Sequence, residues 1–407
     1  MYQILQGMRV VECASFIAAP SCSLHLQQMG AQVIRIDPIG GGPDFHRWPL
    51  AADGSSLYWE GLNKGKLSVA VDFGSPQGRE LVAQLVCAPG DGGGLFVTNF
   101  PVDGFLSHQR LRQRRADLIT TRVMGWADGT PAVDYTVNAA VGLPYMTGAP
   151  GTEHEPVNHV LPAWDLLAGA YAAFALLAAE RHRQRTGQGQ EVRVPLADIA
   201  ITSLGHLGQI AEVLGGTDRA KMGNTLFGAF GRDFTTADGE RLMVVAITPR
   251  QWSGLVAALD LGRVVKEIET ALGVSFKKDE GLRFQHRELL TPLVEAAIAR
   301  RNSDVLGAAF DTQGVCWGPY RTLKAAVAQD TRLVSGNSLF SMVTHPSGQK
   351  YPTPGAAATL VQSERADATR APALGEHTDQ VLMQLLGLSE GQIDRLHDGG
   401  CVAGPGK

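Results

Sequence analysis

The first third of the chain alternates between strand-like and helix-like patterns, which limits the folds that it can adopt. Short runs of β-branched and apolar residues occur at residues 8–14, 31–37, 67–72, 95–99 and 118–123. Helical patterns follow two of these runs, at residues 20–29 and 75–86. Strands that alternate with helices form βαβ units around a parallel sheet. We therefore expect an α/β protein whose ligands bind beyond the carboxyl ends of the strands.

The pattern changes after about residue 220. Residues 232–247 contain Ala-Asp-Gly-Glu between two strand-like stretches, which predicts a hairpin. Helical patterns then occur at residues 251–259 and 287–300, with further helices near 323–329, 378–386 and 390–396. We expect a large domain over residues 1–222 and a smaller α+β domain over residues 223–325.

Composition excludes several classes of protein. Apolar residues make up 44% of the 407 residues, charged residues make up 19% and the net charge is -4, which does not indicate a general nucleic-acid binder. The five cysteines are scattered without metal-type spacing, which is typical of reduced thiols in a cytoplasmic protein. Residues 1–8 show no signal pattern, and the apolar run 166–179 is too short to span a bilayer, so we interpret it as a buried helix.

Asp165 directly precedes that apolar run. A carboxylate at the start of an apolar helix is partly desolvated, so it is a better nucleophile than a surface carboxylate and can attack a bound acyl group. The alternative is that Asp165 is only the N-cap of the helix, a common role for aspartate.

Other enzyme classes lack their motifs. Asp37 ends the second predicted strand, as the ribose-binding acid of nicotinamide enzymes does, but residues 15–20 after the first strand contain no glycine for a pyrophosphate turn. The sequence has no Gly-x-Ser-x-Gly elbow, no P-loop and no Cys-x-x-Cys, and His154 and His159 are not spaced as helical zinc ligands. Carboxylate chemistry on an acyl group remains.

Loops at strand ends supply candidate binding groups. The N–H groups of residues 15–20 could hold an oxyanion or a phosphate, unless this segment is an ordinary strand-to-helix turn. Asn99 and Phe100 end the fourth predicted strand, where the aromatic ring could stack on an adenine or serve only the turn. Lys66 and Arg110 could meet phosphates, although plain surface charge is the alternative for both.

Together these pieces resemble the family III CoA-transferases, a family that includes formyl-CoA and carnitine CoA-transferases and α-methylacyl-CoA racemase. The resemblance covers nearly the whole chain. It includes Gly-Ala-Gln-Val-Ile-Arg-Ile-Asp at 30–37, Asn-Lys-Gly-Lys at 63–66, Thr-Gly-Gln-Gly-Gln at 186–190 and Leu-Gly-Glu-His-Thr at 374–378. Shorter matches lie at residues 5–12, 18–20, 42–44 with Arg47, 99–101, 223–224 and 318–319.

The resemblance places the family's catalytic aspartate on Asp165. It implies that this carboxylate attacks a thioester carbonyl, forms a mixed anhydride, and is then attacked by the CoA thiolate to give an aspartyl thioester. Backbone N–H groups near Ile17 and Ala18 would stabilise the oxyanion. The expected contacts to coenzyme A, which is part of the substrate and not a permanently bound cofactor, are Phe16, Ala19, Arg35, Lys66, Asn99, Phe100 and Arg110.

The family fold implies a Rossmann-like large domain, to which residues 326–407 return, and a smaller α+β domain. It also implies an interlocked homodimer with the active site at the subunit interface. Neither a membrane nor a nucleic acid is expected as a partner.

Departures from the family pattern narrow the reaction. Val133 stands where the racemases carry a histidine, so one of the two bases for α-proton exchange is absent and transferase chemistry is preferred. Ile17 replaces a polar residue of the formyl-CoA enzymes, so oxalate and formate are not expected. Ala19 stands for the usual glycine, and Met-Gly-Trp-Ala at 124–127 for the usual Gly-Phe-Gly segment.

Residues 37–42, 142–148, 157–165 and 205–213 resemble the family members that move coenzyme A from the C1 to the C4 carboxyl of mesaconate. This resemblance implies an intramolecular transfer within carbon metabolism of the 3-hydroxypropionate type. We expect Arg47 to hold the idle carboxylate, with Trp48, Tyr135 and His159 as further substrate contacts. The alternatives are an intermolecular transferase for a succinyl-, citramalyl- or itaconyl-CoA type of substrate and a non-catalytic acyl-CoA-binding protein.

Overall fold

The computed structural model describes residues 1–406, which divide into two compact units. The larger unit contains Met1–Val141, His159–Gly216 and the chain from Thr331 onward, and the smaller contains Gly142–Asn158 and Thr217–Asp330. The smaller unit therefore begins before residue 223 and ends after residue 325. It also includes a separate earlier segment, Gly142–Asn158, that sequence patterns did not indicate.

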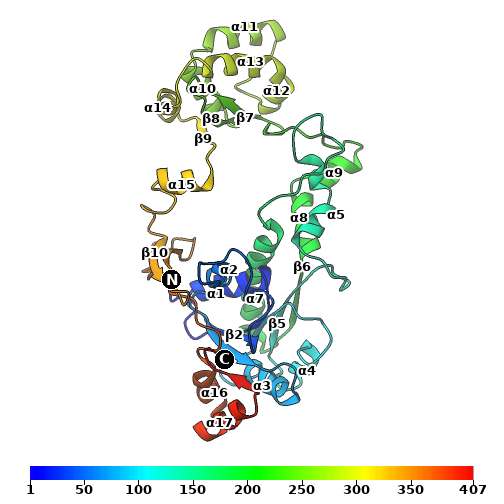
Figure 1. The fold of residues 1–407 in the computed structure, drawn as a ribbon. Coiled ribbons are helices and arrows are strands. Elements are labelled where there is room, and N and C mark those ends of the chain that lie inside the picture. Colours follow the sequence, from blue (N-terminus) through cyan, green and yellow to red (C-terminus); the bar gives the residue numbers. More distant parts are fainter. Residues whose placement is uncertain (407) are drawn as a thin grey trace. The chain divides into compact units, whose positions relative to one another are not determined.

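A seven-stranded sheet forms the centre of the larger unit (Figure 1), in the order β12-β3-β2-β1-β4-β5-β6. All neighbours are parallel except β12, which pairs antiparallel with β3. The strands are β1 (Arg9–Cys13), β2 (Gln32–Pro38), β3 (Leu67–Val71), β4 (Leu95–Thr98), β5 (Ile119–Met124), β6 (Glu191–Pro195) and β12 (Val402–Ala403). The α/β class predicted from the alternating patterns is confirmed.

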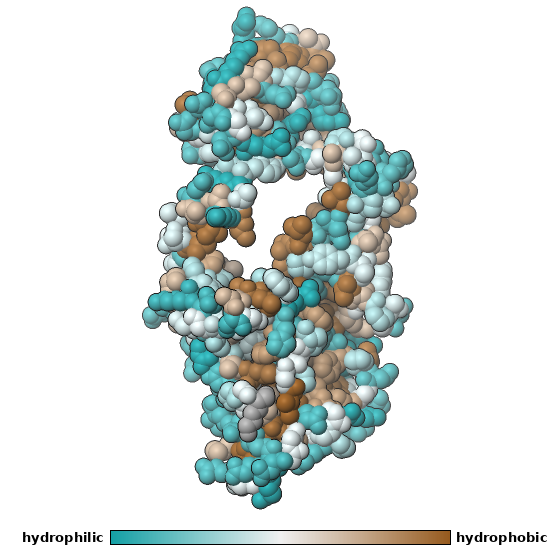
Figure 2. Space-filling view, in the orientation of Figure 1, coloured by the Kyte–Doolittle hydropathy of each residue, from teal (hydrophilic) through white to brown (hydrophobic). Residues whose placement is uncertain are grey.

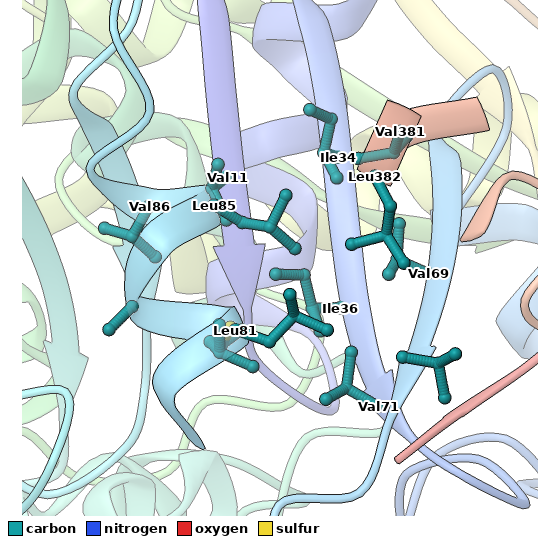
Figure 3. Close-up of a cluster of buried hydrophobic side chains, with 14 of the residues drawn as sticks. Val11, Ile34, Ile36, Val69, Val71, Leu81, Leu85, Val86, Val381 and Leu382 are labelled. Carbon is teal, nitrogen blue, oxygen red and sulfur yellow. The ribbon is translucent and has the colours of Figure 1, made fainter. Parts of the chain in front are cut away.

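Alternation along the strands gives the two faces of the sheet different chemistry. Val11, Ile34 and Ile36 point to one face, where helices α3 (Pro76–Val86) and α16 (Thr378–Leu386) cover them (Figure 3). Because successive side chains of a strand point to opposite faces, Glu12 and Arg35 point to the other face. This face is covered by α1 (Ala18–Gln28), whose Pro20 carbonyl oxygen accepts a hydrogen bond from Lys66.

Helices α1 and α7 (Ala163–Thr186) pack closely because α7 has a glycine at their contact. A Cβ at Gly169 would overlap the Ser21 hydroxyl and lie 2.7 Å from the Ala18 carbonyl oxygen. Since Gly169 is one turn after Asp165, this approach brings the first turn of α7 to the start of α1.

Helix α7 is longer than sequence patterns indicated, with 24 residues ending at Gly187 in the left-handed conformation. Within the described residues, only α7 is long and apolar enough to cross a membrane, and 44% of its most apolar window is buried. The core helix of a soluble protein passes the same test.

Two further segments of the larger unit are a short helix and a hairpin that contacts it. Helix α2 (Leu57–Leu62) is capped by Ser56, whose hydroxyl accepts from Trp59 N–H at 3.0 Å. Its Glu60 accepts hydrogen bonds from the hairpin of β10 (Phe340–Thr344) and β11 (Lys350–Pro354) that returns from the C-terminal part. The remaining helices of this unit are α4 (His108–Arg112), α5 (Asp134–Ala140), α8 (Leu196–His206), α9 (Gln209–Leu214) and α17 (Glu390–Asp398).

The smaller unit contains an antiparallel sheet of β7 (Phe230–Thr235), β8 (Arg241–Ala246) and β9 (Cys316–Pro319). Its own core includes Phe230 and Trp252. Its helices are α6 (Leu143–Met146), α10 (Pro249–Ala258), α11 (Gly262–Leu272), α12 (Glu280–Gln285), α13 (Arg287–Ile298), α14 (Ser303–Gln313) and α15 (Leu323–Gln329).

Candidate active site

The candidate site lies where the strand order of the large sheet reverses, between β1 and β4. In open α/β sheets, the loops that leave two such neighbouring strands diverge and form a crevice for ligands. Here Asn99 after β4 joins Ser15 after β1 through a pair of hydrogen bonds, at 2.9 Å from Asn99 Nδ2 to the Ser15 carbonyl oxygen and at 3.3 Å from Ser15 N to Asn99 Oδ1.

The segment after β1 presents unpaired N–H groups. Phe16 has a φ of 71°, and helix α1 begins two residues later without a side-chain cap. The first N–H groups of a helix have no acceptor within it. Among residues 1–406, the structure pairs neither the Ile17 N–H nor the Ala18 N–H with an acceptor. These two groups are therefore available to an oxyanion.

Asp165 lies in the first turn of α7, and another carboxylate caps this turn. Asp134, at the start of α5, is 1% exposed and its Oδ2 accepts from Trp164 N at 2.7 Å and from Asp165 N at 3.1 Å. Because Asp134 supplies the cap, the Asp165 side chain is not used for capping. The N-cap alternative for Asp165 is therefore wrong, and its partly buried carboxylate is available for chemistry.

His159 and Tyr135, both predicted from the sequence, lie beside this cap. His159 Nε2 is 2.5 Å from Asp134 Oδ1. The Tyr135 ring meets the His159 ring edge-on at 5.8 Å, and the Tyr135 hydroxyl donates to the Val160 carbonyl oxygen at 3.4 Å. The carboxylate of Asp134 thus links His159 to the turn that carries Asp165.

The surroundings of Asp165 raise its pKa to about 7. Burial is the main cause, the negative charge of Asp134 raises the pKa further, and the positive charge of Arg47 opposes both. A carboxylate with a raised pKa is more basic and less solvated than a free one, which suits a nucleophile that must attack a thioester.

Arg47 and Tyr58 are the other polar groups near Asp165. The exposed guanidinium of Arg47 lies 5.5 Å from the ring centre of Phe16 and 5.4 Å from that of Tyr58, and within residues 1–406 it has no ion-pair partner. Burial raises the pKa of Tyr58, and its buried hydroxyl is unpaired in the described chain. Both groups can donate to a substrate carboxylate.

Arg35 and Lys66 require a correction, because the structure encloses both side chains completely. Arg35 pairs with Glu12, Asp37 and Asp44, and Lys66 pairs with Glu12. A side chain with no exposed surface cannot reach a phosphate of coenzyme A. These two cations stabilise the carboxylates beneath the site instead of binding the ligand.

The remaining predicted contacts lie outside this cluster. The ring of Phe100 meets Phe73 edge-on at 5.9 Å, and Ala19 is 1% exposed, so it offers almost no surface to a ligand. Arg110 on α4 is exposed, and Trp48 is 76% exposed.

Three functional positions were missed by sequence reasoning. Asp134 was noticed only as the neighbour of Val133. Its role as a cap depends on contacts with Trp164 and Asp165, which lie 30 and 31 residues later in the chain. Tyr58 gave no signal because the pattern around it is that of an ordinary short helix. Gly169 could have been suspected, because a glycine inside a helix weakens it unless close packing requires one.

Comparison with known proteins decides the family. The sequence model described as CoA-transferase family III matches residues 5–378. The chain belongs to CoA-transferase family III. The matched range includes Asp165, whose carboxylate is partly buried and has a raised pKa.

Individual relatives agree with this assignment. This CoA-transferase is 49% identical over 407 residues to the 2-methylfumaryl-CoA isomerase of Chloroflexus aurantiacus, covering 100% of this chain and 99% of that protein. It is 27% identical to the succinyl-CoA:glutarate CoA-transferase of Mus musculus, over 98% of this chain and 90% of that protein. A CAIB/BAIF family protein from Brucella suis shares the fold, with a TM-score of 0.75 and 24% identity over 95% of this chain and 100% of that one.

Residues 1–406 contain no group of three or more His, Cys, Asp and Glu side chains arranged to hold a metal, and the five cysteines are unpaired. The thioester on which a CoA-transferase acts is brought by its substrate, of which coenzyme A is a part.

Proposed function

We propose that the enzyme moves coenzyme A between the C1 and C4 carboxyls of mesaconate and so converts 2-methylfumaryl-CoA into 3-methylfumaryl-CoA. The observation that carries this proposal is the 49% identity, over the full length of both chains, with a 2-methylfumaryl-CoA isomerase. The desolvated carboxylate of Asp165 provides a group that can carry coenzyme A between the two ends.

The reaction begins with attack of Asp165 on the thioester carbonyl at C1. The C–S bond breaks, a mixed anhydride forms and CoA leaves as a thiolate. The thiolate then attacks the Asp165 carbonyl carbon, which gives an aspartyl-CoA thioester and releases the C1 carboxylate. When mesaconate offers its C4 carboxylate instead, the same steps run in reverse and regenerate Asp165.

Intramolecular transfer requires that free mesaconate stays bound while it turns. Arg47 supports this step, because its unpaired guanidinium lies between the rings of Phe16 and Tyr58 near Asp165. The Tyr58 hydroxyl and His159 are further donors for the idle carboxylate. A site that keeps the dianion close raises its effective concentration above that of competing acids.

Product analysis with both mesaconyl-CoA regioisomers tests this function. Incubation of either pure regioisomer should give the same mixture of the two, as measured by liquid chromatography and mass spectrometry. Isotopically labelled free mesaconate added at millimolar concentration should not enter the CoA ester. Efficient entry of the label would instead support an intermolecular transferase, the activity of the relatives near 27% identity.

The exposed apolar side of α7 supports a homodimer. Leu167, Tyr171 and Phe174 are 43%, 51% and 64% exposed, and Figure 2 shows apolar residues on the visible surface in the region of α7 and α8. Contiguous apolar surface of this kind marks a protein–protein contact. We expect light scattering to give twice the chain mass of 43.3 kDa, and a monomer at micromolar concentration would contradict this expectation.

The interlocked arrangement of the two copies, a cytoplasmic location and a role in 3-hydroxypropionate-type carbon fixation complete the proposal. The interlocked arrangement and the carbon-fixation role rest on the family resemblance, and the cytoplasmic location rests on the scattered cysteines.

A further inference from the structure

Phe16 holds a backbone conformation that a residue with a side chain seldom adopts. Its φ is 71°, and Asp260 is the only other residue except glycine with a positive φ in the described chain. The Cβ of an L-residue crowds the backbone in this region. The Phe16 ring is 40% exposed, so burial of the ring does not hold the backbone in place. Another contact must do so.

That contact comes from Asp44. Its Oδ2 accepts from Phe16 N at 3.0 Å, and the residue is 1% exposed. Both oxygens also accept from Arg35 Nη2, at 3.0 and 3.1 Å. Arg35 is in turn held by Asp37 and Glu12, inside the large sheet. Asp44 is therefore a fixed acceptor and not a mobile surface carboxylate.

The neighbouring anchors hold other points of the same segment. Asn99 bonds to both backbone groups of Ser15, and Lys66 Nζ donates to the Pro20 carbonyl oxygen at 3.0 Å. Only the bond from Asp44 acts on the N–H of Phe16 itself. Because φ and ψ of Phe16 together orient the next peptide plane, the left-handed conformation of Phe16 decides where the Ile17 N–H points.

We propose that Asp44 is a positioning residue, which keeps Phe16 left-handed and thereby directs the Ile17 and Ala18 N–H groups to the carbonyl oxygen that becomes negative during acyl transfer. This inference rests on the proposed acyl chemistry at Asp165, but not on the identity of the acyl group. The effect should fall on kcat and not on KM, because these donors act on charge that develops in the transition state.

The test is a double-mutant cycle between positions 44 and 16. Asp44→Asn should lower kcat by roughly 10- to 100-fold, less than the 10²–10³ typical of complete loss of one oxyanion donor. Phe16→Gly removes the penalty for a positive φ, so D44N should lower kcat less than about threefold in that background. Phe16→Ala is the matched control: it also removes the ring but keeps the Cβ, so D44N should act there with its full effect.

Equal effects of D44N in all three backgrounds would overturn the proposal, because a purely structural role for Asp44 in pairing Arg35 does not depend on the Cβ of residue 16. Asp44→Glu keeps the charge that pairs with Arg35 and displaces the oxygens, so it replaces D44N in the cycle if that variant is insoluble. Independently, F16G should have a higher urea midpoint than F16A. The reverse order would show that Phe16 is not held left-handed in solution.

Single-turnover release of CoA in the presence of hydroxylamine is the readout. It requires only an acyl-enzyme on Asp165. Product analysis with the wild-type enzyme tests whether mesaconyl-CoA is isomerised. The ratios of the single-turnover rates among the variants test the role of Asp44. The two conclusions can therefore fail separately.

Discussion

Replacement of Asp165 by asparagine should abolish turnover. We expect kcat to fall by roughly 10⁴-fold or more, since removal of a covalent nucleophile lowers kcat in other enzymes by up to about 10⁶-fold. Asparagine keeps the shape of the side chain, and the cap of α7 is supplied by Asp134, so the fold should be retained. Steady-state isomerisation and hydroxylamine trapping both measure the loss.

Trapping gives the more specific result. With the wild-type enzyme, acyl-CoA and hydroxylamine should leave a hydroxamate on the peptide that contains Asp165, visible by mass spectrometry. The Asp165→Asn protein should bind the acyl-CoA with near-normal affinity and carry no adduct. Asp165→Ala is a second variant, because deamidation of an asparagine would restore the aspartate whereas an alanine cannot. Turnover within tenfold of the wild type in either variant would show that coenzyme A is carried elsewhere.

Replacement of Asp134 should produce the second largest effect. Asp134→Ala removes the only acceptor of the Trp164 and Asp165 N–H groups in the described chain and leaves His159 without this partner. Because misplacement of a reacting group by about 1 Å lowers the rate about 10²-fold, we expect a fall in kcat of at least that size. The unpaired N–H groups should lower the free energy of unfolding by about 1–3 kcal/mol.

Asp134→Asn separates the two roles of this side chain. The amide oxygen still accepts both N–H groups, so stability should largely return, but the negative charge that raises the pKa of Asp165 is lost. In the wild type the attacking form is the carboxylate, so kcat/KM should fall as pH drops through about 7. In the variant this midpoint should move to lower pH, because only burial then opposes ionisation of Asp165 and the repulsion from Asp134 is gone.

The measurement is the pH dependence of kcat/KM from pH 5 to 9. Asp128→Asn, on an exposed turn after β5, is a matched control that removes one carboxylate and should leave the midpoint unchanged. An unchanged midpoint in Asp134→Asn would mean that the charge of Asp134 does not reach Asp165.

The parts of the fold that sequence predicted best are those with a local signal. Short runs of β-branched and apolar residues marked five strands of the large sheet, because parallel strands that are buried on both faces read as near-continuous apolar runs. Helix α7 was underestimated because its last turns, from Glu180 to Thr186, are charged and polar, and only Gly187 ends it. The excursion Gly142–Asn158 into the smaller unit left no local trace.

The site was predictable where a residue acts through its own position in the chain. Asp165 stands before an apolar helix and the residues after β1 open another helix, so the sequence alone could propose both as site residues. The burial of Arg35 was not foreseen, although its place between Ile34 and Ile36 put it opposite to those apolar side chains. The link between Asp134 and Asp165 joins residues 31 apart, and only the folded chain reveals it.

The pairing of β12 with β3 joins Val402 to Val71, so the outer edge of the central sheet is completed by residues that lie 331 positions later in the chain. Until those residues leave the ribosome, β3 offers open backbone N–H and C=O groups to any other nascent strand. This edge of the sheet is therefore expected to close only after residue 403 has been synthesised, and a chain terminated before that point should be a substrate for chaperones and proteases instead of a partly active enzyme.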